Sequence, residues 1–150
     1  MKLSTKGRYA VMAMTDLAVN GKGRPVALAD IAERQEISLS YLEQLFGKLR
    51  KKGLVKSVRG PGGGYTLGRE AGHLRIADII MAVDEPISTT RCAPGAPQGC
   101  HQNNSRCLTH DLWHSLGTLI QTFLSEVTLK DICEGQVPAV ADRLRGHPVA

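Results

Sequence analysis

A chain of 150 residues has the size of one domain, or of one small domain with an appendage. No apolar run is long enough for a signal peptide or a membrane span, so we expect a soluble, cytoplasmic protein that does not insert into a membrane. In a reducing cytosol, the four cysteines are expected to be thiols or metal ligands rather than a disulfide framework.

The net charge of +5 is divided unevenly along the chain. Residues 1–75 carry 14 Lys and Arg against 6 Asp and Glu, a net +8, whereas residues 76–150 carry 5 against 8, a net −3. Phosphate contact requires such a basic half, but an ordinary solvated surface gives the same count. Charge alone therefore does not decide for DNA.

Helical periodicity predicts three helices in the basic half. The first covers residues 5–20, and a short second helix ends near Gln35. After a tight turn at Glu36-Ile37-Ser38, a third helix runs to Lys52, with Gly53 as its C-terminal cap. A short helix, a tight turn and a longer helix in this order indicate a helix-turn-helix.

The third predicted helix has an apolar face, formed by Leu42, Leu45, Phe46 and Leu49, which should point into a core. The opposite face and its flanks carry short, hydrogen-bonding or basic side chains, which suit base edges and phosphates in a major groove. A solvated helix surface is the alternative interpretation. The candidate DNA contacts in this region are Ser38, Ser40, Tyr41, Glu43, Gln44 and Lys48.

Glu43 has two alternative roles, because phosphate repels an acid that lies close to DNA. Its carboxylate can accept a hydrogen bond from a cytosine amino group. Alternatively, Ser40-Tyr41-Leu42-Glu43 fits a capping box, in which Glu43 satisfies only the backbone at the helix start. The sequence leaves both roles open.

Residues 54–58 and 65–67 have strand-like composition and are joined by the glycine-rich run Arg59-Gly60-Pro61-Gly62-Gly63-Gly64. This pattern predicts a β-hairpin wing. The run lacks the Gly-Lys-Ser/Thr ending of a phosphate-binding P-loop, which argues against a nucleotide site. A glycine tip lets the backbone approach DNA closely, and Arg59 at its base can enter a narrow minor groove. Arg59 and Gly60 are therefore further candidate DNA contacts.

The second half divides into a helix, a loop and a longer helix. A helix with Ile76, Ile79, Ile80 and Val83 on one face should end at Asp84-Glu85-Pro86. The stretch from Thr89 to Ser105 has almost nothing to bury and must be a loop. We assign residues 1–84 to a winged helix-turn-helix domain, 85–110 to a metal-binding loop, 111–134 to a dimerisation helix and 135–150 to a flexible tail.

A long helix is predicted from about Leu108 to Leu129, with a larger apolar stripe than a small monomer can bury. Pairing of two such helices would give a homodimer whose recognition helices read a palindromic operator. The alternative is that the helix folds back onto its own winged domain. The stripe consists of Leu112, Trp113, Leu116, Leu119, Ile120, Phe123, Leu124 and Val127.

Three cysteines and a histidine form the pattern C-x7-C-x6-C-x2-H, with Cys107 and His110 one helical turn apart. Thiolate and imidazole donors suit zinc or an iron-sulfur cluster, and the spacing does not choose between them. Three ordinary loop cysteines are the remaining alternative. His101 and His114 are rival nitrogen ligands, whereas Cys133 is expected to be a packed free thiol. The candidate ligands are Cys92, Cys100, Cys107 and His110.

Three segments and the Cys107-Leu108-Thr109-His110 motif resemble the IscR-like iron-sulfur cluster regulators, over nearly everything up to about Leu129. The segments are Leu3-Ser4-Thr5-Lys6-Gly7-Arg8-Tyr9-Ala10, residues 37–45 and residues 58–65. The resemblance implies a 2Fe-2S cluster on the three cysteines and the histidine, and DNA contacts by Ser40, Tyr41, Gln44 and Arg59. The intervals between the cysteines are longer here than in the best-known members.

The resemblance implies a mainly α protein, with a winged helix-turn-helix, a long C-terminal dimerisation helix and a cysteine-rich loop. Its function would be that of a homodimeric transcription regulator, neither an enzyme nor a membrane protein, that senses cluster status and controls iron-sulfur assembly genes. Double-stranded DNA and the assembly machinery, as cluster donor, would be its partners. Alternatives are a DNA-binding regulator with structural zinc or a thiol- or nitric-oxide-responsive site, and a redox enzyme or electron carrier. The enzyme alternative lacks a substrate-pocket motif.

Overall fold

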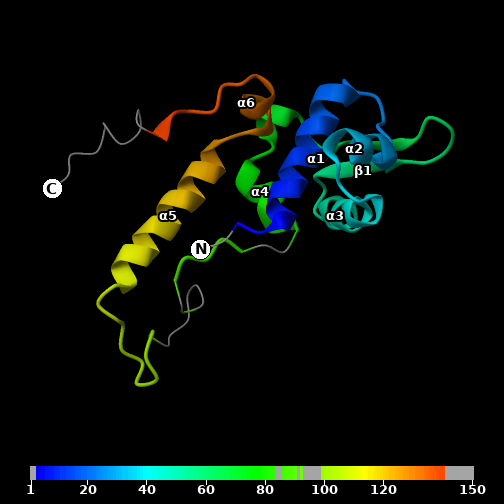
Figure 1. Ribbon diagram of the computed structural model, residues 1–150. Coiled ribbons are helices and arrows are strands. Elements are labelled where there is room, and N and C mark those ends of the chain that lie inside the picture. Colours follow the sequence, from blue (N-terminus) through cyan, green and yellow to red (C-terminus); the bar gives the residue numbers. More distant parts are fainter. Residues whose placement is uncertain (1–2, 84–85, 91, 93–98, 141–150) are drawn as a thin grey trace.

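The computed structural model describes residues 3–83, 86–90, 92 and 99–140 (Figure 1). Within them the fold is mainly helical with a two-stranded wing, as predicted. The elements are α1 (Thr5–Gly21), α2 (Leu28–Gln35), α3 (Leu39–Lys51), β1 (Val55–Val58), β2 (Gly64–Leu67), the 3-10 turn η1 (Ala71–His73), α4 (Ile76–Ala82), α5 (His110–Glu126) and α6 (Leu129–Cys133).

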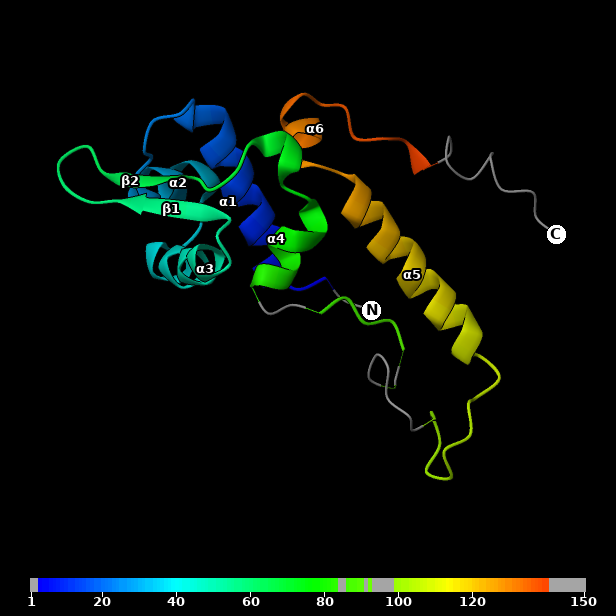
Figure 2. The same cartoon turned by 180° about the vertical axis from the view of Figure 1, so that it is seen from behind.

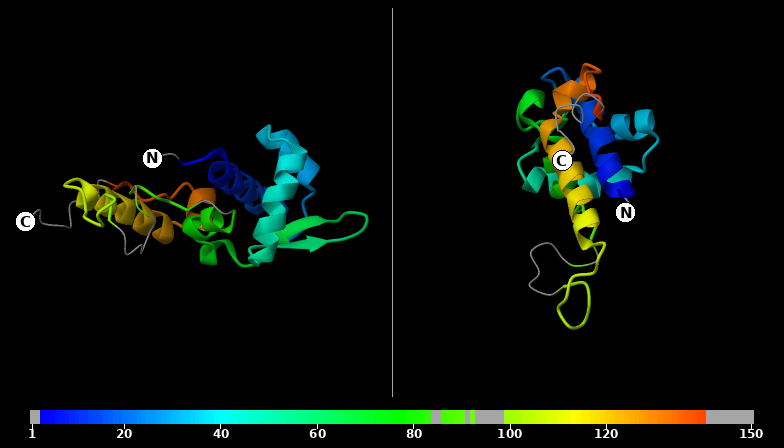
Figure 3. Two further views of the ribbon diagram at one scale, coloured as in Figure 1. Left: turned by 90° about the horizontal axis from the view of Figure 1, so that it is seen from below. Right: turned by 90° about the vertical axis from the view of Figure 1, so that its left-hand side faces the viewer.

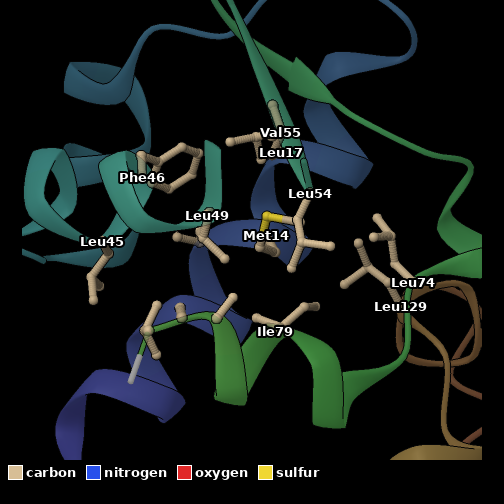
Figure 4. Packing of buried hydrophobic residues seen from close by; sticks show 14 of the residues in the cluster. Met14, Leu17, Leu45, Phe46, Leu49, Leu54, Val55, Leu74, Ile79 and Leu129 are labelled. Atoms are coloured by element: carbon tan, nitrogen blue, oxygen red, sulfur yellow. The ribbon is translucent and has the colours of Figure 1, made fainter. Parts of the chain in front are cut away.

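Helix α1 is central to the packed half of the molecule, because α2, α3, α4, α6 and β2 all contact it. Its Met14 is fully buried and belongs to the same hydrophobic cluster as side chains from α3, α4 and α6 (Figure 4). Among the fully buried residues are Phe46 and Leu49 of α3, Ile79 of α4 and Leu129 of α6. The apolar stripes that the sequence predicted for α1 and α3 thus meet in one core.

The ends of α3 are fixed by local hydrogen bonds. At the start, the Ser38 side chain accepts from the Tyr41 N–H. At the end, Gly53 has a left-handed backbone (φ +74°), and the N–H of Leu54 donates to the Leu49 carbonyl, which closes a Schellman motif. The Gly53 cap is confirmed. The capping box proposed for Ser40 and Glu43 is wrong, because Ser38 caps the helix and Ser40 lies inside it.

The wing is an antiparallel hairpin in which Val55 pairs with Leu67 and Val58 with Gly64. Before α2, Val26 forms an isolated bridge with Tyr65 of β2. A Cβ on Gly64 would overlap the Val26 carbonyl, so this close approach requires glycine. The hairpin and the start of α2 are therefore joined into one unit.

Helix α5 ends earlier than the sequence predicted. Val127 is extended, with ψ 127°, and α6 begins after Thr128, whose side chain forms a capping box with Asp131. The Val127 carbonyl accepts from the Ile76 N–H, and the Leu129 N–H donates to the Leu74 carbonyl. A helix running to Leu129, or from 111 to 134, is therefore wrong, because core contacts extend the chain here.

Most of α5 projects away from the packed half, as Figures 1 and 2 show. Phe123 and Leu124 near its end pack against the core, and Val127 is only 3% exposed, so this end of the predicted stripe folds back. Nearer the start, Leu112 and Trp113 remain exposed. One end of α5 therefore packs on its own winged domain, whereas the other end leaves its apolar side chains free for a partner. Each of the two alternatives describes only part of the helix.

Two further predicted boundaries, the end of the helix before the loop and the start of the tail, lie next to residues that the structure does not describe. Helix α4 ends at Ala82, and the predicted stop at Asp84-Glu85 lies outside the described residues. So does the tail beyond residue 140. None of the helices that are described combines the length and apolarity needed to cross a bilayer.

Candidate metal centre and nucleic-acid interface

The candidate DNA contacts of α3 lie at its start and along one side. Ser38, Ser40, Glu43 and Gln44 are exposed, and Tyr41 is half-buried. The Ser38 and Ser40 hydroxyl oxygens lie 2.9 Å apart. Lys48, in the last turn, is also half-buried. The structure therefore leaves the hydrogen-bonding groups of the predicted recognition face accessible to a ligand.

The start of α1 borders the same face, which the sequence analysis did not anticipate. The Tyr9 ring meets the Tyr41 ring edge-on, with centroids 6.0 Å apart. Thr5 and Tyr9 line an open groove together with Ser40 and Gln44. The sequence predicts this segment only as part of a core helix, because its apolar period gives no sign of what its exposed side borders.

The wing presents Arg59 and Gly60 to solvent at the start of the hairpin loop. Gly60 has φ +98° and Gly62 has φ +71°, which glycine adopts without strain. In Figure 3 the wing extends beyond α2 and α3, at the opposite end of the molecule from α5. Arg59 is thus available to contact a groove next to the one that α3 would enter.

Asp16 of α1 fixes the position of α2. Its carboxylate, only 1% exposed as a side chain, accepts from Arg34 at 2.7 and 3.0 Å and from Gln35 at 2.8 Å. Burial raises the pKa of Asp16, but the hydrogen bonds from Arg34 and Gln35 outweigh it and hold the pKa below its usual value. This ion pair orients the first helix of the helix-turn-helix.

Three of the four predicted ligands converge at the start of α5. Cys100 Sγ lies 3.1 Å from His110 Nδ1, Cys92 Sγ lies 3.5 Å from the same nitrogen, and the two sulfurs are 3.9 Å apart. His110 is the first residue of α5 and is only 9% exposed. These donor atoms form a group that could hold a metal ion.

Cys107 lies beside this group and is hydrogen-bonded to Cys100, although it is not one of the three residues whose donor atoms all lie close to one another. Its Sγ lies 3.5 Å from Thr109 Oγ1, and that hydrogen bond, with a further one from Cys100, lowers the pKa of the Cys107 thiol. At Cys100 a backbone hydrogen bond from Cys107 lowers the pKa, but desolvation and the neighbouring thiols outweigh it and raise the pKa. The His110 N–H donates to the Cys107 carbonyl, so the backbone of Cys107 is held beside the group.

The remaining candidates lie outside the group. His101 is exposed, whereas the His114 ring stacks on His110 with centroids 6.0 Å apart. Cys133 packs against the hydrophobic core as a free thiol, and burial raises its pKa. The prediction that Cys133 is a packed thiol is confirmed.

Both arms of the loop have contacts that the sequence analysis missed. On one arm, the Thr89 hydroxyl donates to the Trp113 carbonyl of α5 (2.6 Å), and the Thr90 hydroxyl donates to the Cys92 carbonyl (2.8 Å). On the other, Asn103 Oδ1 accepts from the backbone N–H and the hydroxyl of Ser105. The sequence holds one signal of the Thr89 contact. A glycine inside a helix, such as Gly117 in α5, lowers helix stability and so indicates a packing reason, here the close approach of Thr89.

The donor set fits a metal or an iron-sulfur cluster. Tetrahedral zinc with Zn–S near 2.3 Å and Zn–N near 2.1 Å needs donors about 3.5–3.8 Å apart, close to the separations found. A 2Fe-2S cluster needs four protein donors, two on each iron. Cys107 would be the fourth, because its backbone already lies one hydrogen bond from His110.

Comparison with known proteins agrees with this combination. Residues 3–135 match the Rrf2 family, described as iron-dependent transcriptional regulators. The HTH-type transcriptional regulator IscR of Xenorhabdus nematophila is 56% identical over 144 residues, covering 95% of this chain and 86% of that protein. IscR of Citrobacter koseri is 53% identical over 148 residues, covering 98% and 89%.

Two solved structures share the fold and much of the sequence. T. potens IscR is 37% identical with a TM-score of 0.69, covering 100% of this chain and 93% of that one. CymR, the global cysteine regulator of B. subtilis, is 36% identical with a TM-score of 0.74, covering 89% and 97%. These proteins are regulators rather than enzymes, so the redox-enzyme hypothesis is set aside. The chain belongs to the Rrf2 family of iron-dependent transcriptional regulators.

Proposed function

We propose that this regulator acts in the cytoplasm as a homodimer, carries a 2Fe-2S cluster and controls iron-sulfur assembly genes according to cluster status. Cys92, Cys100, Cys107 and His110 hold the cluster, which would be delivered by the assembly machinery. When bound, the cluster would supply a redox- and iron-sensitive group, and a change in its state is the signal. We keep the division into a DNA-binding part (1–84), a cluster loop (85–110) and a dimerisation helix, now bounded by α5.

The observation that carries this proposal is the convergence of Cys92, Cys100 and His110 at the start of α5. Two of the three come from a loop with little to bury, so their meeting at a buried histidine is not a by-product of core packing. The same helix carries the exposed side chains Leu112 and Leu119. A change at the site therefore acts directly on the helix that we assign to the dimer interface.

Pairing of two α5 helices would cover that exposed face and place two recognition helices on a palindromic operator. In each protomer, Arg59 and Gly60 contact the neighbouring groove, while Lys48 neutralises phosphate. We assign Glu43 to base contact for two reasons. The capping box with Ser40 does not form, because Ser38 caps α3, and the Glu43 carboxylate is exposed. The other contacts that we propose on α3 are Ser38, Ser40, Tyr41 and Gln44.

Anaerobic purification, followed by a visible spectrum and by iron, sulfide and zinc analysis on one sample, tests the proposal. A red-brown protein with about two irons and two sulfides per chain is expected. Its binding to selected operator DNA should then differ between the loaded and the metal-free forms. Identical affinity of both forms at every operator would contradict cluster sensing.

A structural zinc site is the second candidate, favoured by one observation. The donor separations of 3.1, 3.5 and 3.9 Å are close to those around a single tetrahedral ion. Zinc would bind in the same place and stabilise the loop without sensing. A colourless protein with one zinc per chain, unchanged by anaerobic reconstitution with iron and sulfide, would establish this function in place of the first.

A further inference from the structure

The arm of the loop that ends at Cys92 lies against α5 at one glycine. An added Cβ on Gly117 would overlap the Thr89 hydroxyl and lie 3.4 Å from Thr89 Cβ. The Thr89 side chain therefore occupies the space that Gly117 leaves open. Its hydroxyl donates to the Trp113 carbonyl, one turn earlier in the same helix, at 2.6 Å.

This contact lies on the same face of α5 as the metal centre. Gly117 follows His110 by seven residues, which is about two turns of an α-helix and about 10 Å along its axis. The three residue-to-residue steps from Thr89 to Cys92 span at most about 10 Å when extended. A threonine held at Gly117 thus keeps Cys92 within reach of His110, where its Sγ lies 3.5 Å from Nδ1.

Two exposed apolar residues of α5, Leu112 and Leu119, lie on the other side of the helix. At about 100° per residue, Leu112 and Leu119 are roughly opposite the face that carries His110 and Gly117. Both leucines are exposed, at 60% and 49%. The arm therefore occupies one side of α5 and leaves the proposed dimer side free.

We propose that Thr89 and Gly117 are positioning residues for the metal centre: the Thr89 side chain, seated at Gly117, sets the distance from which Cys92 reaches Cys100 and His110. The Thr90 hydroxyl donates to the Cys92 carbonyl and so orients the backbone of Cys92, the residue at the end of the arm. This inference rests on the proposed function, because it takes Cys92 as a ligand. It adds two residues that touch no donor atom.

The test measures how close two thiols are, without any metal. In a Cys107→Ser, Cys133→Ser background, metal-free full-length protein retains Cys92 and Cys100, whose sulfurs lie 3.9 Å apart. Phenylarsine oxide bridges two such neighbouring thiols, and its affinity is measured by competition with a small dithiol. Gly117→Ala and Thr89→Val should each weaken arsenical binding about fivefold, the equivalent of one hydrogen bond. Thr89→Ser, which keeps the hydroxyl, should retain most of it.

Matched variants separate positioning from a change in the helix. Alanine has a higher helix propensity than glycine, so helix stability alone predicts no loss from Gly117→Ala. Ser115→Ala alters an exposed position on the same helix and should leave arsenical binding unchanged. In a Thr89→Ala background the overlap is absent, so adding Gly117→Ala should have no further effect.

Unchanged arsenical affinity in Gly117→Ala, or an equal loss in Ser115→Ala, would overturn the inference. Additive losses for Thr89→Ala and Gly117→Ala would overturn it as well, because the two residues would then act separately. Failure of the proposed function gives a different result. A wild-type protein that takes up no iron, sulfide or zinc would contradict the cluster, while the arsenical result would still report the position of Cys92.

Discussion

The winged half and the metal-binding loop are held by different forces. In the winged half, the side chains of α1, α3, α4 and α6 meet in a core where Met14, Phe46 and Leu129 have no exposure to solvent. The loop places its donors through a few hydrogen bonds, such as the one that Thr89 donates to the Trp113 carbonyl and the two that Ser105 donates to Asn103 Oδ1. The surface that we propose to read DNA is thus held by core packing, whereas the arrangement of the loop depends on these few bonds and on the group that its donors would bind.

This difference suits a sensor. A recognition surface must keep its shape whether or not the signal is present, so it belongs on a packed scaffold. A sensing site must be able to lose its ligand at a small energetic cost, so few contacts should support it. Helix α5 joins the two regions, since His110 begins it and Phe123 near its end packs against the core.

The largest expected effect comes from removing one donor. Cys92→Ala should abolish cluster loading, because two thiols and one imidazole cannot complete the four-donor set. The free energy of unfolding of the winged half should change by less than about 0.5 kcal/mol, because Cys92 is not part of its core. Iron and sulfide content, with urea unfolding of the metal-free protein, measures both quantities.

Cys133→Ala is the matched control, since it removes a thiol that packs against the core, away from the donor group. It should load iron and sulfide like the wild type. Equal loss of loading in both variants would mean that the loop and the core are not independent.

Phe46→Ala tests the other region. Phe46 is fully buried, and its ring meets the Tyr65 ring with centroids 5.0 Å apart. Its loss should lower the free energy of unfolding by about 4 kcal/mol. At low temperature, where enough protein stays folded, phenylarsine oxide should still bridge Cys92 and Cys100. Failure of that bridging in folded protein would contradict the separation of the two regions.

The same contrast explains what the sequence predicted well. The apolar periods of α1 and α3 and the glycine after α3 are local patterns with one physical meaning each, and the structure confirms them. The break at Val127 is not local: it arises because Leu74 and Ile76, some fifty residues earlier, bond to the chain there. No helical period could reveal that partner.

The metal centre was predictable as a set of residue types but not as a geometry. Thiols and an imidazole within one short stretch indicate a site, and the structure brings Cys92, Cys100 and His110 together. Which loop residues hold the arms in place depends on contacts such as that between Thr89 and Gly117. Those contacts follow from the packing of α5, so spacing along the chain does not show them.

Asp16→Asn should produce a smaller loss of stability than Phe46→Ala, about 2 kcal/mol, because the hydrogen bonds from Arg34 and Gln35 lose a charged acceptor. The pKa of Asp16 is lowered in the folded protein, so its contribution is present above the pKa of the unfolded chain, near 3.8. It is lost as the pH falls through the lower folded-state pKa.

Urea unfolding between pH 6 and about pH 3 measures the difference between the wild type and the Asn variant. The difference should be constant above about pH 5 and shrink below pH 4. Asp131 also has a lowered pKa, through its hydrogen bonds with Thr128, but it is present in both proteins and cancels. A difference that grows on acidification would contradict the assigned sign.

Arg59→Ala has the smallest expected effect, because the wing contact is one among many. Binding to operators selected from random duplexes should weaken about tenfold across sequences, and the slope of log affinity against log salt should fall by about one. Lys130→Ala removes the same charge from α6 and should change neither quantity, since Lys130 pairs with Glu134 far along the chain from the wing. The loss of operator affinity should be the same in loaded and metal-free protein, because the wing belongs to the packed half, whose structure does not depend on the loop. An Arg59→Ala loss seen in only one of the two forms would show that the metal centre moves the wing, and the two regions would have to be treated as one.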